Sequence, residues 1–236
     1  MANSKAKATA NIKKNRIYIT IAGNADSKAL EQLYTDIRFC VADLKPGFEV
    51  VSDISQCNLI YLGGFPIYKK IIDYLIAHNV GEIIRIIKND NISFKQIINF
   101  SEKIHCYRTI YADNKEQAEE RLEQLIKREG IRLHVNPVMC SYELNGTSVP
   151  GNLADISVSG CAFMTDAVLP PIEAAITVTL TFSPHESFCA DFHLAAKVVR
   201  HQGQLFAVQF HNLDQEDKQA LYKRLAHEIS QVSFIL

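Results

Sequence analysis

The sequence changes its pattern once, close to Arg132, and this change constrains the fold more than any other feature. Before it, runs rich in β-branched residues alternate with segments whose apolar residues recur every three or four positions. After it, short apolar runs follow one another, separated by turn residues such as Asn145-Gly146. Alternating strands and helices predict an α/β layer, whereas six successive short strands favour a closed antiparallel barrel, because closure removes the edges of the sheet. We therefore expect two domains.

The expected boundaries are a flexible tail over residues 1–15, an α/β domain over 16–127 and a β-barrel domain over 128–236. The tail is predicted because its small, polar and basic residues bury too little apolar surface to offset the cost of ordering. In the α/β domain we expect strands at 16–22, 48–54, 81–87 and 107–111, and helices at 27–44, 63–79, 93–103 and 114–129. In the barrel domain we expect strands at 133–142, 149–157, 161–165, 174–182, 188–200 and 205–211, and a closing helix at 214–230.

Two short polar motifs flank the start of the predicted barrel. Arg128 and Arg132 stand four positions apart where a charged helix gives way to apolar strands, and a planar guanidinium both forks onto phosphate and stacks on a base. Asp155 and Ser157 project to one face of an extended chain, and Gly160 follows them at a predicted sharp turn. A purely structural alternative has the two arginines ending a helix and opening a strand.

Together the two motifs resemble the PilZ domain, whose signature is Arg-x-x-x-Arg followed by Asp-x-Ser-x-x-Gly. The resemblance covers residues 128–236 and includes Lys197 to Arg200 and Gly203 to Phe210, which look like later strands of that domain. It implies a six-stranded antiparallel barrel with a C-terminal helix, and binding of the bacterial second messenger cyclic di-GMP. In this interpretation both arginines contact phosphates and guanine faces. Asp155, Ser157 and Gly160 are assigned to recognition of the guanine edge and to the turn that makes this recognition possible.

The first domain resembles, more weakly, the STAS fold of anti-sigma-factor antagonists. The resemblance rests on the order of elements and on residues 51–64, where a strand ending in Asp53-x-Ser55 leads to a helix. The position of the phosphorylatable serine of that family is matched by Leu62 here, between Tyr61 and Gly63. A kinase-controlled switch is therefore not expected, while docking of a protein to this helix start stays open.

Composition narrows the remaining classes of function. The 25 basic and 26 acidic residues nearly cancel, so we expect no binding of nucleic acid. No stretch approaches twenty consecutive apolar residues, so we expect no membrane insertion. From Gly130 onward the chain has 6 basic and 10 acidic residues, so an anionic ligand must be held by local geometry. The six cysteines show no Cys-x-x-Cys pair, and we expect buried thiols in the cytoplasm rather than a metal site.

The histidines likewise have no partnered carboxylate at ligand spacing, so we expect no catalysis and no cofactor. The leading interpretation is a non-enzymatic bacterial receptor that binds cyclic di-GMP and relays the signal through the α/β domain to an unidentified protein partner. The alternative is a protein-interaction scaffold whose barrel has lost its ligand.

Overall fold

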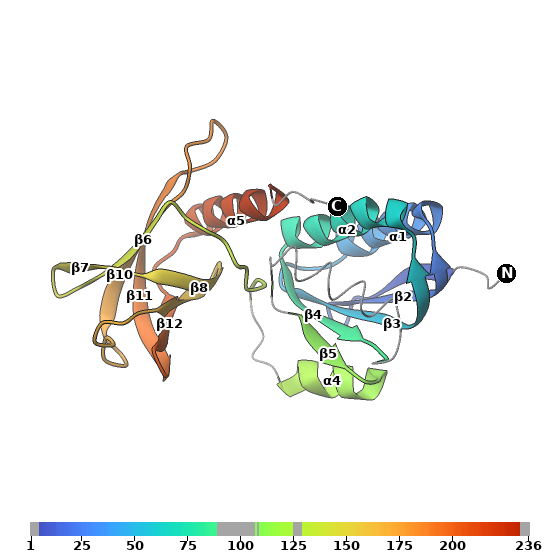
Figure 1. Cartoon of the computed structure of the whole chain (residues 1–236), viewed down its shortest axis with the longest axis horizontal. Coiled ribbons are helices and arrows are strands. Elements are labelled where there is room, and N and C mark those ends of the chain that lie inside the picture. Colours follow the sequence, from blue (N-terminus) through green and yellow to red (C-terminus); the bar gives the residue numbers. More distant parts are fainter. Residues whose placement is uncertain (1–4, 89–106, 108, 125–128, 232–236) are drawn as a thin grey trace. The chain divides into compact units, whose positions relative to one another are not determined.

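The computed structural model describes residues 5–88, 107, 109–124 and 129–231. The chain divides into two compact units, one within residues 1–131 and the other within residues 132–233 (Figure 1). The first is an α/β unit and the second is built mainly from β-strands, as the change of pattern predicted.

The N-terminal unit holds a five-stranded sheet. Its strands, in the order in which they lie side by side, are β1 (Lys5–Asn11), β2 (Arg16–Ala25), β3 (Phe48–Ile60), β4 (Val80–Ile86) and β5 (Ile110–Ala112). β1 and β2 form an antiparallel hairpin, whereas β2, β3, β4 and β5 run parallel. Every residue of β4 is buried, as expected for a strand inside a parallel sheet that helices cover.

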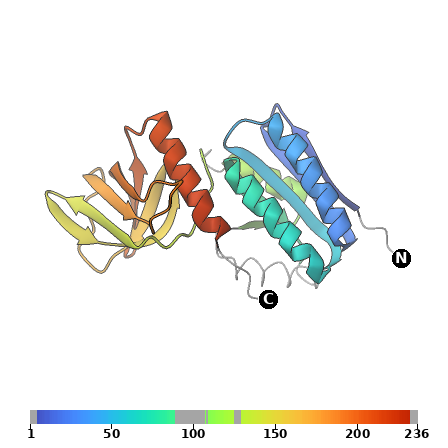
Figure 2. The same ribbon diagram turned by 90° about the horizontal axis from the view of Figure 1, so that it is seen from above.

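Helices cover both faces of this sheet. α1 (Ser27–Ala42) and α2 (Phe65–Ala77) lie side by side on one face, and α4 (Lys115–Gln124) lies on the other (Figures 1 and 2). A single 3-10 turn, η1 (Leu62–Gly64), leads into α2. The side chain of Asp26 caps α1 by accepting a hydrogen bond from the backbone N–H of Ala29, so the cap lies one residue before Ser27, the predicted start.

The predicted N-terminal tail is wrong for residues 5–11, which form the edge strand β1. Seven residues of β1 pair with β2, and these backbone hydrogen bonds order a segment in which only Ala8 is buried. The composition rule considers side-chain burial and therefore misses an edge strand held through its backbone. The alternating Lys5 and Lys7 suit an exposed edge, because charged side chains oppose pairing with another chain.

The C-terminal unit holds a seven-stranded antiparallel sheet. Its strands, in spatial order, are β7 (Thr147–Pro150), β6 (Met139–Leu144), β10 (Ala175–Thr181), β11 (Asp191–Gln202), β12 (Leu205–Phe210), β9 (Gly160–Met164) and β8 (Asn152–Ser157). The predicted Asn145-Gly146 turn joins β6 to β7, and both residues have positive φ, at 53° and 79°.

The prediction of a closed six-stranded barrel needs correction. The sheet has seven strands, with β7 and β8 at the two ends of its order, because the stretch expected as one strand over 149–157 is divided at Gly151. β7 pairs with β6 at one end of the sheet order, and β8 pairs with β9 at the other end. A Cβ atom on Gly151 would lie 2.8 Å from the ring of Phe163, so a glycine allows the chain to bend close to the core there. Residues 147–157 thus form both edge strands of the sheet, β7 and β8.

An aromatic group lies at the centre of this unit. The rings of Tyr142, Phe163 and Phe206 have centroids 5.0 to 5.7 Å apart and are almost fully buried. The predicted closing helix is α5 (Gln215–Ser230), and Asp214 caps it by accepting a hydrogen bond from the backbone N–H of Asp217. α5 buries Leu221, Tyr222, Arg224, Leu225 and Ile229.

Three other expectations concern the helix at 93–103, the burial of the cysteines and the absence of membrane insertion. The helix expected over 93–103 lies outside the described residues. Among the described cysteines, Cys57 and Cys161 are buried as predicted, but Cys189 is exposed. Within the described part of the chain, no helix is both long enough and apolar enough to cross a membrane.

Candidate functional site

A short extended segment after the unit boundary pairs with the free edge of β8. Leu133 and Ile156 exchange two backbone hydrogen bonds of 2.7 and 2.9 Å in an antiparallel bridge. Both side chains point into the core, with exposed fractions of 1% and 0%. Because side chains alternate along an extended chain, Arg132 and His134 project to the opposite face from Leu133.

β8 contains a β-bulge immediately before Asp155. Leu153 pairs with Phe163 and Asp155 pairs with Ala162, so Ala154 is an extra residue without a partner on β9. The carbonyl oxygen of Ala154 instead accepts a hydrogen bond from His134 Nδ1, at 2.7 Å. Bulges of this kind re-aim the neighbouring side chain, here that of Asp155.

The structure brings Arg132 and Asp155 together, although they come from the two separate motifs. Arg132 Nη1 donates to both carboxylate oxygens of Asp155, at 2.9 and 3.1 Å. The side chains keep exposed fractions of 28% and 21%, so the ion pair can be reached from solvent. In the hydrogen bonds within the described residues Arg132 uses only Nη1, and its Nε and Nη2 donors make none there. We call the surface formed by Arg132, His134 and Asp155 the polar face of β8.

Ser157 and Gly160 belong to the turn that connects β8 to β9. Ser157 is buried, with an exposed fraction of 4%, and its hydroxyl contacts Ser159 Oγ and the carbonyl oxygen of Gly160, both at 3.2 Å. The backbone N–H of Ser159 also donates to this hydroxyl, at 3.4 Å. The hydroxyl of Ser157 therefore holds the turn in shape, a local role typical of serine.

The neighbouring strand, not the backbone conformation, requires a glycine at position 160. Gly160 is absent from the glycines with positive φ, so no left-handed backbone conformation requires it. Instead, a Cβ atom there would lie 2.2 Å from the carbonyl oxygen of Val208 on β12. The close approach of the neighbouring strand excludes any side chain at this position.

Arg128, the first arginine of the motif, lies outside the described residues. Its predicted role therefore stays a prediction. Of the other four predicted site residues, Arg132 and Asp155 form the ion pair, whereas Ser157 and Gly160 form the turn that follows it. Sequence reasoning missed His134, although the alternation Arg132-x-His134 indicates that both side chains share a face.

Two thiols lie within or close to this part of the sheet. Burial raises the pKa of Cys161 well above its ordinary value, and the neighbouring Cys140 and Asp155 add to the increase. Burial also raises the pKa of Cys140 to about 12. Both thiols therefore stay protonated at neutral pH, as expected of structural rather than reactive cysteines.

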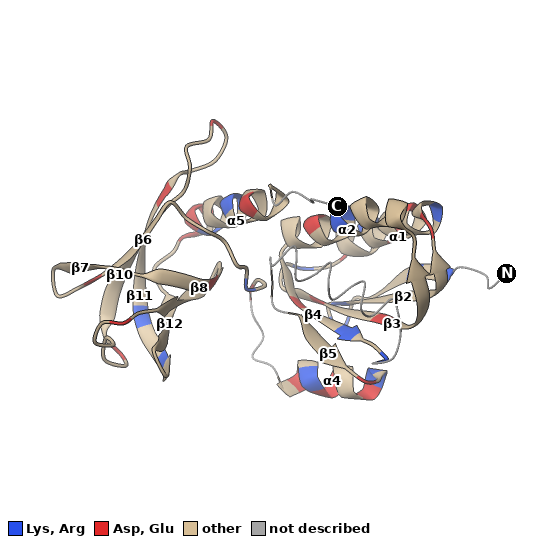
Figure 3. Ribbon diagram, in the orientation of Figure 1, with Lys and Arg blue, Asp and Glu red and all other residues tan. Residues whose placement is uncertain are grey.

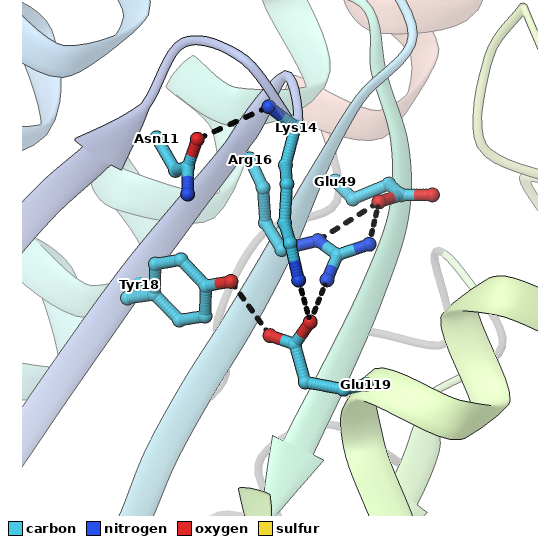
Figure 4. Close-up of polar contacts among 6 residues, drawn as sticks. All are labelled: Asn11, Lys14, Arg16, Tyr18, Glu49 and Glu119. Carbon is cyan, nitrogen blue, oxygen red and sulfur yellow. Dashed lines mark hydrogen bonds and ion pairs between the residues drawn. The ribbon is translucent and has the colours of Figure 1, made fainter. Parts of the chain in front are cut away.

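A second polar group, in the N-terminal unit, joins residues that lie far apart in the sequence (Figure 4). Glu119 on α4 accepts hydrogen bonds from Lys14, Arg16 and Tyr18, at 2.5 to 2.6 Å. Arg16 also donates through Nε and Nη2 to Glu49 Oε2, at 2.9 and 2.5 Å. We call these five residues the Glu119 cluster.

Electrostatics hold the Glu119 cluster in its charged form. Burial acts to raise the pKa of Glu119, but hydrogen bonds from Lys14, Tyr18 and Arg16 outweigh it and lower that pKa to about 2. Glu49 outweighs the effect of burial on Arg16 and raises its pKa. Each charge in the cluster has a partner within the protein, so removal of one partner should destabilise the unit.

The segment of the weaker STAS resemblance, residues 51–64, lies in β3 and η1. Asp53 Oδ1 accepts hydrogen bonds from the backbone N–H and hydroxyl of Ser55, at 3.0 and 2.7 Å. Tyr61 and Leu62 are exposed, at 48% and 73%, where β3 leads into η1. Within the described residues, no group of three or more histidine, cysteine, aspartate or glutamate side chains is arranged to hold a metal ion.

The C-terminal unit is a seven-stranded antiparallel sheet with one helix, and it follows an α/β unit along the chain. Residues 113–227 match the model of the PilZ domain family. The match begins in the N-terminal unit, just before α4, and so starts earlier than the expected residue 128. No curated protein matches the chain in sequence.

Solved structures are similar to each half of the chain. The unphosphorylated anti-sigma factor antagonist SpoIIAA is 14% identical with a TM-score of 0.38, over 52% of this chain and all (100%) of that one. The PilZ domain of Escherichia coli YcgR with c-di-GMP is 13% identical with a TM-score of 0.36, over 45% and 93%. The PilZ domain of CeSA from a cellulose-synthesizing bacterium is 14% identical with a TM-score of 0.32, over 42% and 99%.

Proposed function

We propose that this protein is a non-enzymatic bacterial receptor that binds cyclic di-GMP on the polar face of β8. The observation that carries the proposal is the PilZ match over residues 113–227, which contain both motifs. The contact between Arg132 and Asp155 supports it, because residues 23 positions apart in the sequence meet in one accessible polar surface.

The chemistry of this face suits a nucleotide with two phosphates and two guanines. The guanidinium of Arg132 keeps donors for a phosphate oxygen and a planar surface for a base. An ionised carboxylate has about four acceptor sites, so Asp155 can hold Arg132 and also accept from the N–H groups of a guanine edge. Arg128 is proposed to contribute a second guanidinium, while Ser157 and Gly160 support the face through the turn.

We further propose that binding is relayed to a protein partner through the N-terminal unit. The segment between the two motif arginines joins the units covalently, and Gly130 within it tolerates a backbone change that other residues resist. A ligand shifts such an equilibrium only by binding one arrangement more tightly than the other. The relay therefore requires that the free protein samples both arrangements.

Calorimetric titration of the full chain with cyclic di-GMP tests the proposed binding. The wild-type protein should bind, and Arg132→Ala should weaken binding at least about tenfold, because a hydrogen bond to a charged group contributes about 1.5–3 kcal/mol. Arg132→Lys should lose most of the affinity as well, since lysine keeps the charge but not the planar fork.

Arg200→Ala provides the matched control for this titration. Arg200 is an exposed arginine on β11, three strands from β8 in the sheet order, so its removal should leave the affinity unchanged. Absence of heat and of any thermal shift for the wild-type protein at high micromolar nucleotide would reject the receptor and favour the scaffold.

A further inference from the structure

The pairing of the segment after the unit boundary with β8 places His134 beside Asp155. Leu133 bridges Ile156 in antiparallel register, so the next residue along one strand lies opposite the previous residue on the other. His134 therefore lies opposite Asp155, and Arg132 lies opposite Ser157. His134 is exposed and projects, like Arg132, away from the core.

The bulge at Ala154 holds the imidazole ring of His134 in one orientation. The ring nitrogen Nδ1 lies 2.7 Å from the carbonyl oxygen of Ala154. A carbonyl oxygen only accepts hydrogen bonds, so Nδ1 carries the proton of this bond. In the neutral ring the other nitrogen, Nε2, is then an acceptor with no partner among the contacts of the described residues.

Two acceptors, the Asp155 carboxylate and His134 Nε2, thus stand on neighbouring strands of one accessible surface. The Watson–Crick edge of guanine carries two adjacent donors, the ring N1–H and the exocyclic N2 amino group. The corresponding edge of adenine offers one amino donor beside an unprotonated ring nitrogen, which faces an acceptor unfavourably. A surface with two adjacent acceptors therefore favours guanine over adenine.

We propose that His134 is a specificity-determining residue of this binding face, which accepts a hydrogen bond from guanine through Nε2 while Asp155 accepts the second. This inference rests on the proposed function, because it assigns a further residue to the same ligand. The bulge at Ala154 is then the feature that fixes the tautomer and direction of the ring.

Titrations with cyclic di-GMP and with cyclic di-AMP test the role of His134 in the full-length protein. His134→Phe keeps an aromatic ring but has no acceptor, and His134→Ala removes the ring. Both variants should lose about three- to tenfold in affinity for cyclic di-GMP, the range expected for one neutral hydrogen bond, and should not lose affinity for cyclic di-AMP. His134→Gln offers a side-chain oxygen as acceptor and should retain more of the preference for guanine than His134→Phe.

The outcomes separate this inference from the proposed function. If the wild-type protein and Arg132→Ala behave as proposed but His134→Phe and His134→Ala bind cyclic di-GMP with wild-type affinity, His134 has no part in recognition. Equal losses in the glutamine and phenylalanine variants, or equal losses for both nucleotides, would overturn the role of Nε2 as an acceptor for guanine. A wild-type protein that binds neither nucleotide rejects the proposed function itself.

Discussion

The strand β12 leaves no space for a side chain at position 160. The close contact between position 160 and the carbonyl oxygen of Val208 predicts that Gly160→Ala destabilises the C-terminal unit by about 1–3 kcal/mol, the usual cost of forcing extra atoms into a packed site. The strand must also shift, and the shift should disturb the adjacent turn at Ser157 and weaken nucleotide binding. Thermal unfolding together with titration measures both effects.

Gly203→Ala is the control that distinguishes a steric clash from backbone strain. Gly203 has a φ of +61° and nothing within 4 Å of the position that a Cβ atom would occupy, so alanine there should cost only about 1 kcal/mol and leave binding unchanged. A Gly160→Ala protein with wild-type stability would contradict the steric reason given for this glycine.

At the polar face of β8, some contacts could be predicted from the sequence motifs and others could not. The two motifs predicted that Arg132 and Asp155 serve one site, and the structure places them in contact. The position of His134 depends on the bridge between Leu133 and Ile156 and on the bulge at Ala154, and neither follows from local sequence preference. The predicted contact of Ser157 with the ligand stays a prediction, and its buried hydroxyl also supports the turn, which the motif alone did not indicate.

The helix α4 contacts the sheet through few apolar residues and through the polar side chain of Glu119. Its sequence is strongly polar, with charges of both signs along its length (Figure 3), and it buries only Ala118 and Leu122. These two residues join a small apolar cluster with Val51, Ile84 and Ile86. The Glu119 cluster therefore supplies much of what holds α4 to the sheet.

Glu119→Gln should lower the stability of the N-terminal unit by about 1–3 kcal/mol at neutral pH, because it leaves Arg16 and Lys14 with weaker partners. The pKa of Glu119 in the folded protein, about 2, lies below its ordinary value of 4.5. Its contribution is thus present above about pH 4.5 and is lost as the pH falls towards 2. The difference between variant and wild type should shrink over that range.

Urea unfolding curves at pH 7 and pH 3 check this prediction. Glu123→Gln is the matched control, since Glu123 is an exposed carboxylate on the same helix and outside the cluster. Equal stability of Glu119→Gln and wild type at pH 7, or a difference that grows on acidification, would show that the cluster does not stabilise α4.

Elements with strong periodicity could be predicted, whereas those held by distant contacts could not. The apolar stripe and the Asp214 cap of α5 are local features, and the predicted helix is observed. The edge strand β1 depends on backbone pairing with β2, and the division at Gly151 depends on the ring of Phe163. Similarly, the residues of the Glu119 cluster come from β2, β3 and α4 and the turn before β2, and no sequence window contains them together.

On the scale of the whole molecule, the family match and the division into units do not coincide. The PilZ match includes α4 and the residues that follow it, although the chain up to Ile131 belongs to the N-terminal unit. The relay proposed above therefore predicts that nucleotide raises hydrogen-exchange protection across residues 126–131 as well as at the binding face. Protection confined to the C-terminal unit would mean that the ligand binds without any relay.

Hydrogen exchange of the full-length protein, followed with and without saturating cyclic di-GMP, tests the central claim most directly. The proposed face predicts slower exchange in peptides covering residues 132–134 and 154–161, because the nucleotide covers the segment and the bulged strand that form it. Cyclic di-AMP at the same concentration should protect these peptides less. Unchanged exchange at both segments, under conditions in which calorimetry shows cyclic di-GMP bound, would contradict the claim and place the nucleotide elsewhere on the protein.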